Sequence, residues 1–124
     1  MNIKTLPMIH NNDPETLFLT LSNGINVIEI RSLVRVKASS NYSWLYFSNG
    51  KKILTAKTLQ WFDETLSGTN FIRVHRTHLV NTSFIRRYCK QGGGKLHLFN
   101  GDAVDISRRK RSLFLQNWRG LAAS

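Results

Sequence analysis

The sequence predicts a mainly β fold of short antiparallel sheets and hairpins, with one short central helix and one C-terminal helix. Asn-Gly dipeptides at Asn23, Asn49 and Asn100 each separate two apolar runs of strand length. Asn-Gly in this setting favours a hairpin, because both residues tolerate positive φ. The chain has 124 residues, 41% of them hydrophobic, so one domain can bury a core without a disulfide or a metal.

Residues 1–16 are polar and irregular, and Asp13-Pro14 predicts a turn. Residues 17–121 are predicted to form the folded domain. The strand-like runs are Leu17–Leu21, Ile25–Ile30, Leu33–Val36, Tyr42–Phe47, Lys52–Thr55, Phe71–Val74, Leu79–Asn81, Ile85–Lys90, Leu96–Phe99 and Ala103–Ile106.

The central helix is predicted over residues 56–67. Leu59, Phe62 and Leu66 lie at helical spacing there, and Gly68 follows as a residue suited to end a helix. One face of this helix is therefore expected to enter the core.

The second helix is predicted over residues 107–121, with Ser107 as its N-cap. Its apolar residues at helical spacing are Leu115, Trp118 and Leu121. Gly92–Gly94 precedes a strand-like run, whereas a phosphate-binding glycine loop precedes a helix. We therefore expect a flexible hairpin turn at the three glycines.

Charge is the strongest global signal, since 18 Lys and Arg against 7 Asp and Glu give a net charge of +11. The excess is concentrated in the second part of the chain, where residues 73–124 carry eleven cations and only two acids. A field of one sign favours a polyanion. Basic proteins are also common for solubility alone, but clustering in predicted turns favours nucleic acid here.

Cys89 is the only cysteine, so an intrachain disulfide is excluded, and a small buried side chain is its expected role. The apolar runs are too short to span a bilayer, and residues 1–10 do not have the layout of a signal peptide. We expect a cytoplasmic protein that does not contact membranes.

Four consecutive cations follow Ser107, at residues 108–111. If Ser107 caps a helix, Arg108, Arg109 and Lys110 occupy its first turn, where the helix dipole disfavours positive charge by about 0.3–1 kcal/mol each. Such a placement suits phosphate binding by backbone N–H and guanidinium groups, or pairing of an arginine with guanine. The alternative is a solvated basic helix end.

The run His75-Arg76-Thr77-His78 connects two predicted strands. Arg76 and Thr77 are suitable donors to bases or phosphates. Two histidines three residues apart, without a cysteine or acid nearby, are weak metal ligands, so we expect one of them to buttress the loop by a hydrogen bond.

A third polar segment, Ser39–Tyr42, contains Ser40 and Asn41. Asn41 is suited to pairing with adenine, and equally to a turn position with positive φ. Lys57, near the start of the central helix, is a further candidate phosphate contact. Acids are scarce, and Ser107 has no evident His and Asp partners, so we expect no enzyme activity, cofactor or metal site.

These segments together resemble the LytTR family of bacterial DNA-binding domains. The resemblance covers roughly residues 17–118. The matching segments, which follow the family's order and spacing, are Val36–Tyr42, Lys57–Leu59, Phe71–Asn81 with Ile85, and Asn100–Gly101 to Ser107–Arg109.

The resemblance implies an elongated fold whose loops enter successive major grooves on one face of the duplex, contacting the minor groove between them. It also implies two direct repeats in the target, bending of the DNA, and self-association on tandem sites. The DNA-facing groups would be Ser40 and Asn41, then Arg76 with Thr77, then Arg108 with Arg109. The family's common phosphate-accepting receiver domain does not fit in residues 1–16, so the chain is either a stand-alone regulator or an excised output domain of a response regulator.

Two other functions fit the composition. One is a non-specific nucleic-acid or RNA-binding β module that stacks bases on Tyr42, Trp44 or Tyr46. The alternation of these aromatics with Leu45 and Phe47 indicates that one face of their strand is core. The other is a protein-interaction module with an acidic partner.

Overall fold

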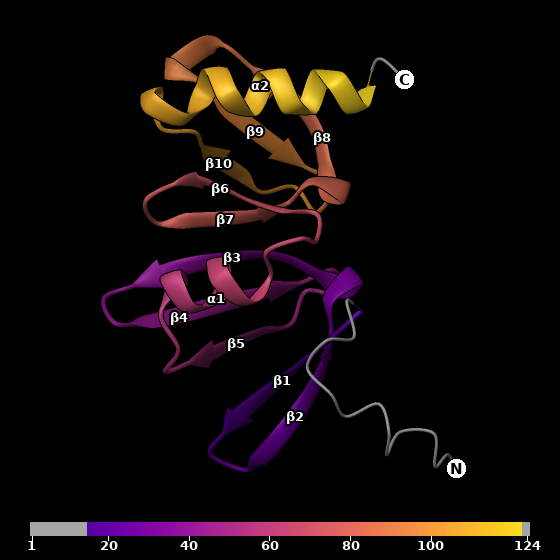
Figure 1. Cartoon of the computed structure of the whole chain (residues 1–124), viewed down its shortest axis with the longest axis vertical. Coiled ribbons are helices and arrows are strands. Elements are labelled where there is room, and N and C mark those ends of the chain that lie inside the picture. The colour runs from indigo at the N-terminus through magenta and orange to yellow at the C-terminus, as the bar shows by residue number, and fades with distance from the viewer. Residues whose placement is uncertain (1–14, 123–124) are drawn as a thin grey trace.

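The structure, a computed structural model, describes residues 15–122, with side chains as far as Trp118. Figure 1 shows an elongated molecule whose three parts are stacked along its long axis. A two-stranded hairpin lies at one end, a five-stranded sheet with helix α1 in the middle, and a three-stranded sheet with helix α2 at the other end. The predicted mainly β fold with two helices is confirmed. The turn predicted at Asp13-Pro14 lies outside the described residues.

The terminal hairpin consists of β1 (Thr16–Leu21) and β2 (Gly24–Glu29), which pair antiparallel along their full length. Its tight turn follows from the Asn-Gly signal, because Gly24 takes a φ of 123° that other residues rarely adopt. The strand begins at Thr16, one residue inside the segment predicted to be irregular.

The middle sheet is antiparallel, in the order β5-β4-β3-β7-β6. Its strands are β3 (Leu33–Ser39), β4 (Tyr42–Phe47), β5 (Lys52–Thr55), β6 (Phe71–His75) and β7 (His78–Asn81). The third strand continues past the predicted Val36, because Ser39 still pairs with Tyr42 across the β3–β4 turn.

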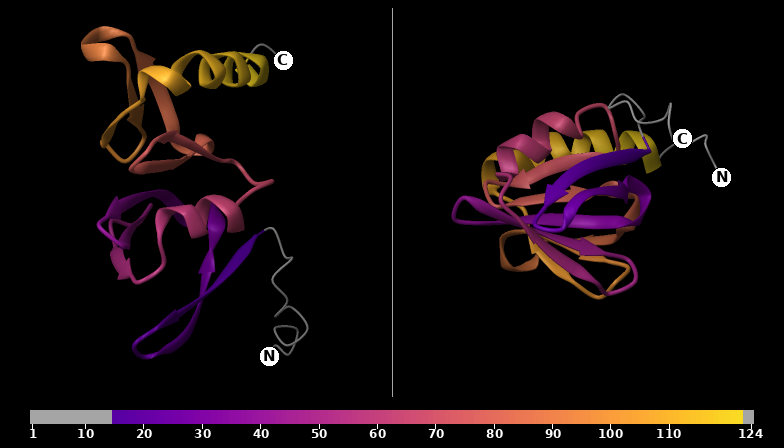
Figure 2. Two further views of the ribbon diagram at one scale, coloured as in Figure 1. Left: turned by 60° about the vertical axis from the view of Figure 1, so that its left-hand side comes forward. Right: turned by 90° about the horizontal axis from the view of Figure 1, so that it is seen from below.

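Helix α1 (Leu59–Thr65) covers this sheet and the hairpin with the predicted face, since Leu59, Phe62 and Leu66 are all buried. It begins later than predicted, because Thr58 is the N-cap and its hydroxyl accepts from the N–H of Trp61 at 3.1 Å. Viewed along the long axis, α1 and α2 lie on the same side of the sheets (Figure 2).

The second end of the molecule has its own core. Strands β8 (Ile85–Cys89), β9 (Lys95–Leu98) and β10 (Ala103–Asp105) pair antiparallel in the order β10-β9-β8. Helix α2 (Arg108–Ala122) packs on them. Val34, Val74 and Val80 of the middle sheet belong to this same core, so the three-stranded sheet and α2 rest on the middle sheet.

The apolar face predicted for α2 packs against this core through Leu115 and Trp118, and the structure adds Phe114 to it. Phe114 is its buried residue, at 2% exposure, whereas Leu115 and Trp118 are half-buried. The rings of Phe114 and Trp118 stack with centroids 5.7 Å apart, and their i,i+4 spacing puts them on one face. The side chain of Leu121 lies outside the described residues.

The three glycines lie in the hairpin turn between β8 and β9, as expected. This turn includes a 3-10 turn at Gln91–Gly93. The Arg111 guanidinium donates to the carbonyl of Gly93, and a Cβ on Gly94 would lie 3.0 Å from Nε of Arg111. Arg111 therefore fastens α2 to this loop. Cys89, expected to be buried, is only half-buried at the end of β8.

Candidate nucleic-acid interface

Three polar segments lie along one edge of the molecule: residues 39–42 between β3 and β4, residues 75–78 between β6 and β7, and residues 107–110 at the start of α2 (Figure 1). Backbone hydrogen bonds join neighbouring segments. The N–H of Ala38 donates to the carbonyl of Thr77 at 2.9 Å, and the N–H of Ser107 donates to that of Val74 at 2.8 Å. We call this continuous surface the turn edge.

The β3–β4 turn contributes Ser40 and Asn41, both exposed. Ser40 takes the left-handed backbone conformation, with a φ of 59°. The alternative role considered for Asn41, a turn residue of positive φ, is therefore wrong. The side chain of Asn41 is exposed at this turn, so its amide is accessible to a ligand.

The β6–β7 turn presents Arg76 at its tip, with an exposed side chain. The hydroxyl and the backbone N–H of Thr77 lie 2.9 and 3.2 Å from Nδ1 of His75. Because a backbone N–H only donates, Nδ1 is the acceptor, and the ring proton of neutral His75 is on Nε2. His75 is thus the histidine that buttresses the loop, and the half-buried Thr77 is part of that support.

Arg73, which was not among the residues predicted to form the site, also supports this turn. Its Nε donates to the carbonyl of His75 at 3.2 Å, and its Nη2 donates to the carbonyl of Arg76 at 2.6 Å. Its Nη1 lies 3.6 Å from Oδ2 of Asp63 on α1. The available signal was an arginine inside the otherwise apolar strand Phe71–Val74.

At the start of α2, Ser107 is the N-cap, since the N–H of Lys110 donates to its hydroxyl at 3.3 Å and to its carbonyl at 3.1 Å. Arg108 and Arg109 are exposed and Lys110 is half-buried. Within residues 15–122, none of these three cations has an acidic side chain within ion-pair distance. Arg111 points instead to the glycine loop, so the four consecutive cations divide into three on the turn edge and one in the fold.

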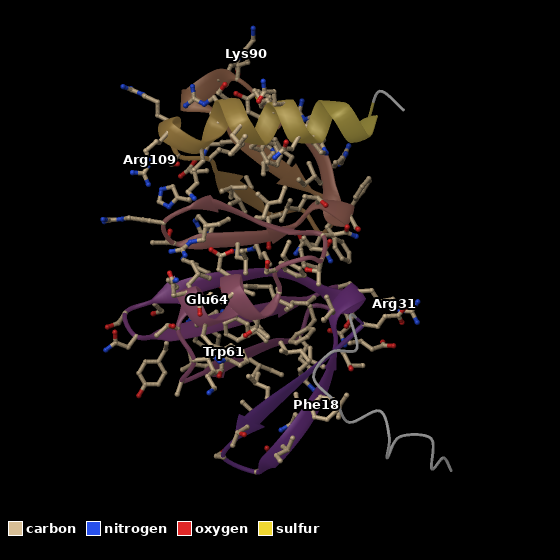
Figure 3. The ribbon with its side chains drawn as sticks, in the orientation of Figure 1. Phe18, Arg31, Trp61, Glu64, Lys90 and Arg109 are labelled. Carbon is tan, nitrogen blue, oxygen red and sulfur yellow. The ribbon has the colours of Figure 1, made fainter. Side chains whose placement is uncertain are left out.

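The β6–β7 turn and the start of α2 enclose an open hollow of about 530 Å³. It is lined by Arg73, His75, Arg76, Ser107, Arg109 and Lys110. Segments more than thirty residues apart in the sequence therefore meet at one strongly cationic depression, and Figure 3 shows Arg109 at this edge. Such a depression suits a phosphate or another anionic group.

Lys57 does not line this hollow. It is exposed in the connection between β5 and α1, which reaches the same edge of the molecule (Figure 1). Its Nζ lies 4.8 Å from the centroid of the Trp61 ring, and its carbonyl accepts from the hydroxyl of Ser43 at 2.8 Å. The lysine is thus anchored at its backbone while its ammonium group remains accessible.

His78 has a different role from His75. Burial lowers the pKa of His78 from 6.5 to about 4, and the positive charge that His75 carries when it is protonated and the charges of Arg35 and Lys37 act in the same direction. The ring is therefore neutral near pH 7 and supplies no charge to an anion. In the described part of the chain, no group of three or more His, Cys, Asp or Glu residues is placed to hold a metal ion.

Three of the four aromatic side chains of β4 lie on the open face of the sheet. Ser43, Leu45 and Phe47 are buried, while Tyr42 is exposed and Trp44 and Tyr46 are half-buried. Cations cover two of these rings.

Arg35 Cζ lies 3.8 Å from the centroid of Tyr46, and Lys52 Nζ lies 4.6 Å from that of Trp44. The stacking surface that a single-strand binder uses is thus partly occupied by the protein's own side chains.

Comparison with known proteins places this arrangement in a family. The model of the LytTr DNA-binding domain matches residues 23–119, most of the chain. The chain belongs to the LytTR family of DNA-binding domains. No protein of curated description matches it.

The fold agrees with the LytTR assignment. The chain is similar to a solved LytTr DNA-binding domain from a methyl-accepting/DNA response regulator of Bacillus cereus, with a TM-score of 0.71 and 21% identity. The similarity covers 82% of this chain and 94% of the other. All turn-edge segments of this LytTR domain fall within the matched residues 23–119. Neither of its helices, within residues 15–122, has the length and apolar character needed to cross a bilayer.

Proposed function

We propose that this LytTR domain is a sequence-specific, double-stranded-DNA-binding transcription regulator whose turn edge enters successive major grooves of direct-repeat sites. The hollow between the β6–β7 turn and α2 carries the proposal, because it gathers cations from two distant segments without an acid among its lining residues. DNA offers the matching row of phosphates and base edges. The protein would act in the cytoplasm, where bacterial DNA lies, and without catalysis.

The residues of the turn edge have different roles in this proposal. Arg76 is the candidate base reader of the β6–β7 turn, because its guanidinium is exposed at the tip and can pair with guanine. His75, as the Nε2–H tautomer, is a donor to phosphate. Thr77 supports the turn through His75 and retains hydroxyl lone pairs for a contact.

At the α2 end, Arg108 and Arg109 are candidates for a second groove, and Lys110 for a phosphate at the helix start. Three cations in the first turn cost about 0.3–1 kcal/mol each against the helix dipole in the free protein. A phosphate bound there is attracted by these cations and by the positive end of the helix dipole, and these attractions offset that cost. A placement that disfavours the free helix is therefore accounted for by the bound state.

The β3–β4 turn, with Ser40 and Asn41, forms the other end of the same edge, and Lys57 lies on the neighbouring connection. We assign Asn41 to a base or backbone contact and Lys57 to a phosphate. Three groups of contacts along an elongated molecule suit a binding site longer than one groove, with contact to the minor groove between them and bending of the duplex. Two copies would occupy direct repeats about one helical turn apart, and would self-associate there.

Selection of bound duplexes from a random library at roughly 0.15 M salt tests the proposal, because non-specific phosphate attraction is weakened there. The proposal predicts a motif of two direct repeats for the wild-type protein and loss of part of that motif for Arg76→Ala. Arg31→Ala is the matched control, since Arg31 is exposed on the side opposite the turn edge (Figure 3). Binding without enrichment would make the domain a general nucleic-acid binder, and a preference for single strands would indicate use of the β4 aromatics.

A further inference from the structure

We propose that Asp63 and Arg73 form a brace that positions the β6–β7 turn for base reading, and that Arg73 is a positioning residue rather than a DNA contact. This inference rests on the proposed function and adds a residue pair that touches no base. The two side chains connect helix α1 to the tip of the turn.

The guanidinium of Arg73 is directed to the turn on two sides. It donates to the carbonyl of His75 at 3.2 Å and to the carbonyl of Arg76 at 2.6 Å, so both peptide units next to the reading side chain are held. Nη1 lies 3.6 Å from the Asp63 carboxylate. All three nitrogens of the side chain therefore have a protein partner.

The backbone itself explains the need for a brace. The pairing of β6 with β7 shifts register between Arg73 and His75, which is a bulge immediately before the turn. A bulge interrupts the ladder hydrogen bonds that otherwise fix a hairpin. The side chain of Arg73 supplies hydrogen bonds to carbonyls at this place, and the anchor on α1 ties the turn to a packed element.

The competing role for Arg73 is a direct phosphate contact, because it lines the cationic hollow. The two roles predict different effects of Asp63→Asn on DNA binding. If Arg73 binds phosphate, loss of the neighbouring negative charge strengthens DNA binding. If Arg73 braces the turn, loss of the anchor loosens the turn and weakens base discrimination, although the protein becomes more positive.

Glu64→Gln is the matched control for Asp63→Asn. Glu64 is the next residue on α1 (Figure 3), and its carboxylate is exposed and accepts from Gln60 of the same helix at 2.8 Å. The two variants change the net charge equally. A difference between them therefore reports the position of the carboxylate and not its charge.

The experiment measures binding of wild type, Asp63→Asn, Glu64→Gln, Arg73→Lys and Arg76→Ala to a duplex library with a randomised central segment. Binding to one fixed non-cognate duplex is followed over a range of salt. Thermal unfolding of each variant identifies any that does not fold. Arg73→Lys keeps the charge but cannot hold two carbonyls and a carboxylate in one plane.

We expect Asp63→Asn and Arg73→Lys to lower preference at the base pair that Arg76→Ala affects, by about threefold to tenfold, and Glu64→Gln to leave it unchanged. The salt dependence on the non-cognate duplex stays the same for both brace variants, because no phosphate contact is lost.

Unchanged preference in Asp63→Asn, or an affinity for the non-cognate duplex that rises more in Asp63→Asn than in Glu64→Gln, would overturn the brace. If Arg76→Ala keeps the base preference of the wild type, the proposed function itself is overturned.

Discussion

Arg35 of β3 and Asp102 of the β9–β10 turn connect the middle sheet to the three-stranded sheet. Nε of Arg35 donates to Oδ2 of Asp102 at 2.8 Å, and the Arg35 side chain is only 12% exposed. Burial by itself raises the pKa of Asp102, but hydrogen bonds from Arg35 and Asn100 and the charge of Arg35 outweigh it and hold the pKa below the ordinary 3.8. The pair therefore stabilises the fold above about pH 4, and this contribution is lost as the pH falls through the lowered pKa.

Asp102→Ala is expected to lower the free energy of unfolding by about 1–3 kcal/mol, because Arg35 keeps its charge in a half-buried site without its partner. Urea unfolding measures this. Asp105→Ala is the control, since the ion pair of Asp105 with Lys95 lies at the surface, where such pairs contribute about 0–1 kcal/mol. Equal losses in the two variants would contradict the role given to Asp102.

The lowered pKa of His78 predicts a pH-dependent stability. With a pKa near 6.5 when unfolded and about 4 when folded, the unfolded chain binds more protons between these values. Stability should therefore be full above about pH 6.5 and should decline as the pH falls toward 4. Urea unfolding at several pH values tests this, and the slope should be absent from His78→Gln.

Phe114 is predicted to hold α2 on its core. Phe114→Ala should lower the free energy of unfolding by about 3–5 kcal/mol, because a fully buried ring leaves a cavity. Leu113→Ala, at a neighbouring position that is 63% exposed, should change it by less than about 0.5 kcal/mol. Chemical unfolding of both variants measures the two free energies. A loss in Leu113→Ala as large as that in Phe114→Ala would refute the packing described.

Two cations of α2 that are two residues apart are predicted to act differently. Arg109→Ala should lower the salt dependence of DNA binding by about 0.9 with little change in stability. Arg111→Ala should leave DNA binding nearly unchanged and cost about 1 kcal/mol of stability, because Arg111 donates to the Gly93 carbonyl. DNA affinity measured over a range of salt, together with thermal unfolding, distinguishes the two variants. A loss of stability in Arg109→Ala with a lowered salt dependence in Arg111→Ala would contradict the roles given to these two cations.

Much of the fold was predictable because its signals are local. Gly24 and Gly101 follow asparagine in tight turns and have positive φ, so the Asn-Gly pattern located those hairpins. Leu59, Phe62 and Leu66 gave α1 by their spacing. Leu115 and Trp118 of the predicted α2 face do pack against the core, but their spacing did not single out Phe114, which is more deeply buried than either.

Most residues of the candidate site could be predicted from the sequence, but the contacts that bring them together could not. Arg76 and Arg109 stand out as cations in turns, yet their meeting around one hollow depends on the hydrogen bond from Ser107 to Val74. The pair of Asp63 and Arg73 was not predicted, because it joins a helix to a strand and such a contact has no local sequence pattern. The division between Arg109 and Arg111 likewise depends on the neighbouring glycine loop.

Hydroxyl-radical footprinting of the selected duplex tests the central claim most directly, that one edge of the domain meets successive grooves on one face of DNA. The account predicts protected segments on a single face that recur about one helical turn apart, and a selective loss of the segment nearest Arg76 in Arg76→Ala. Protection spread evenly around the duplex, or a footprint that Arg76→Ala leaves unchanged, would contradict it.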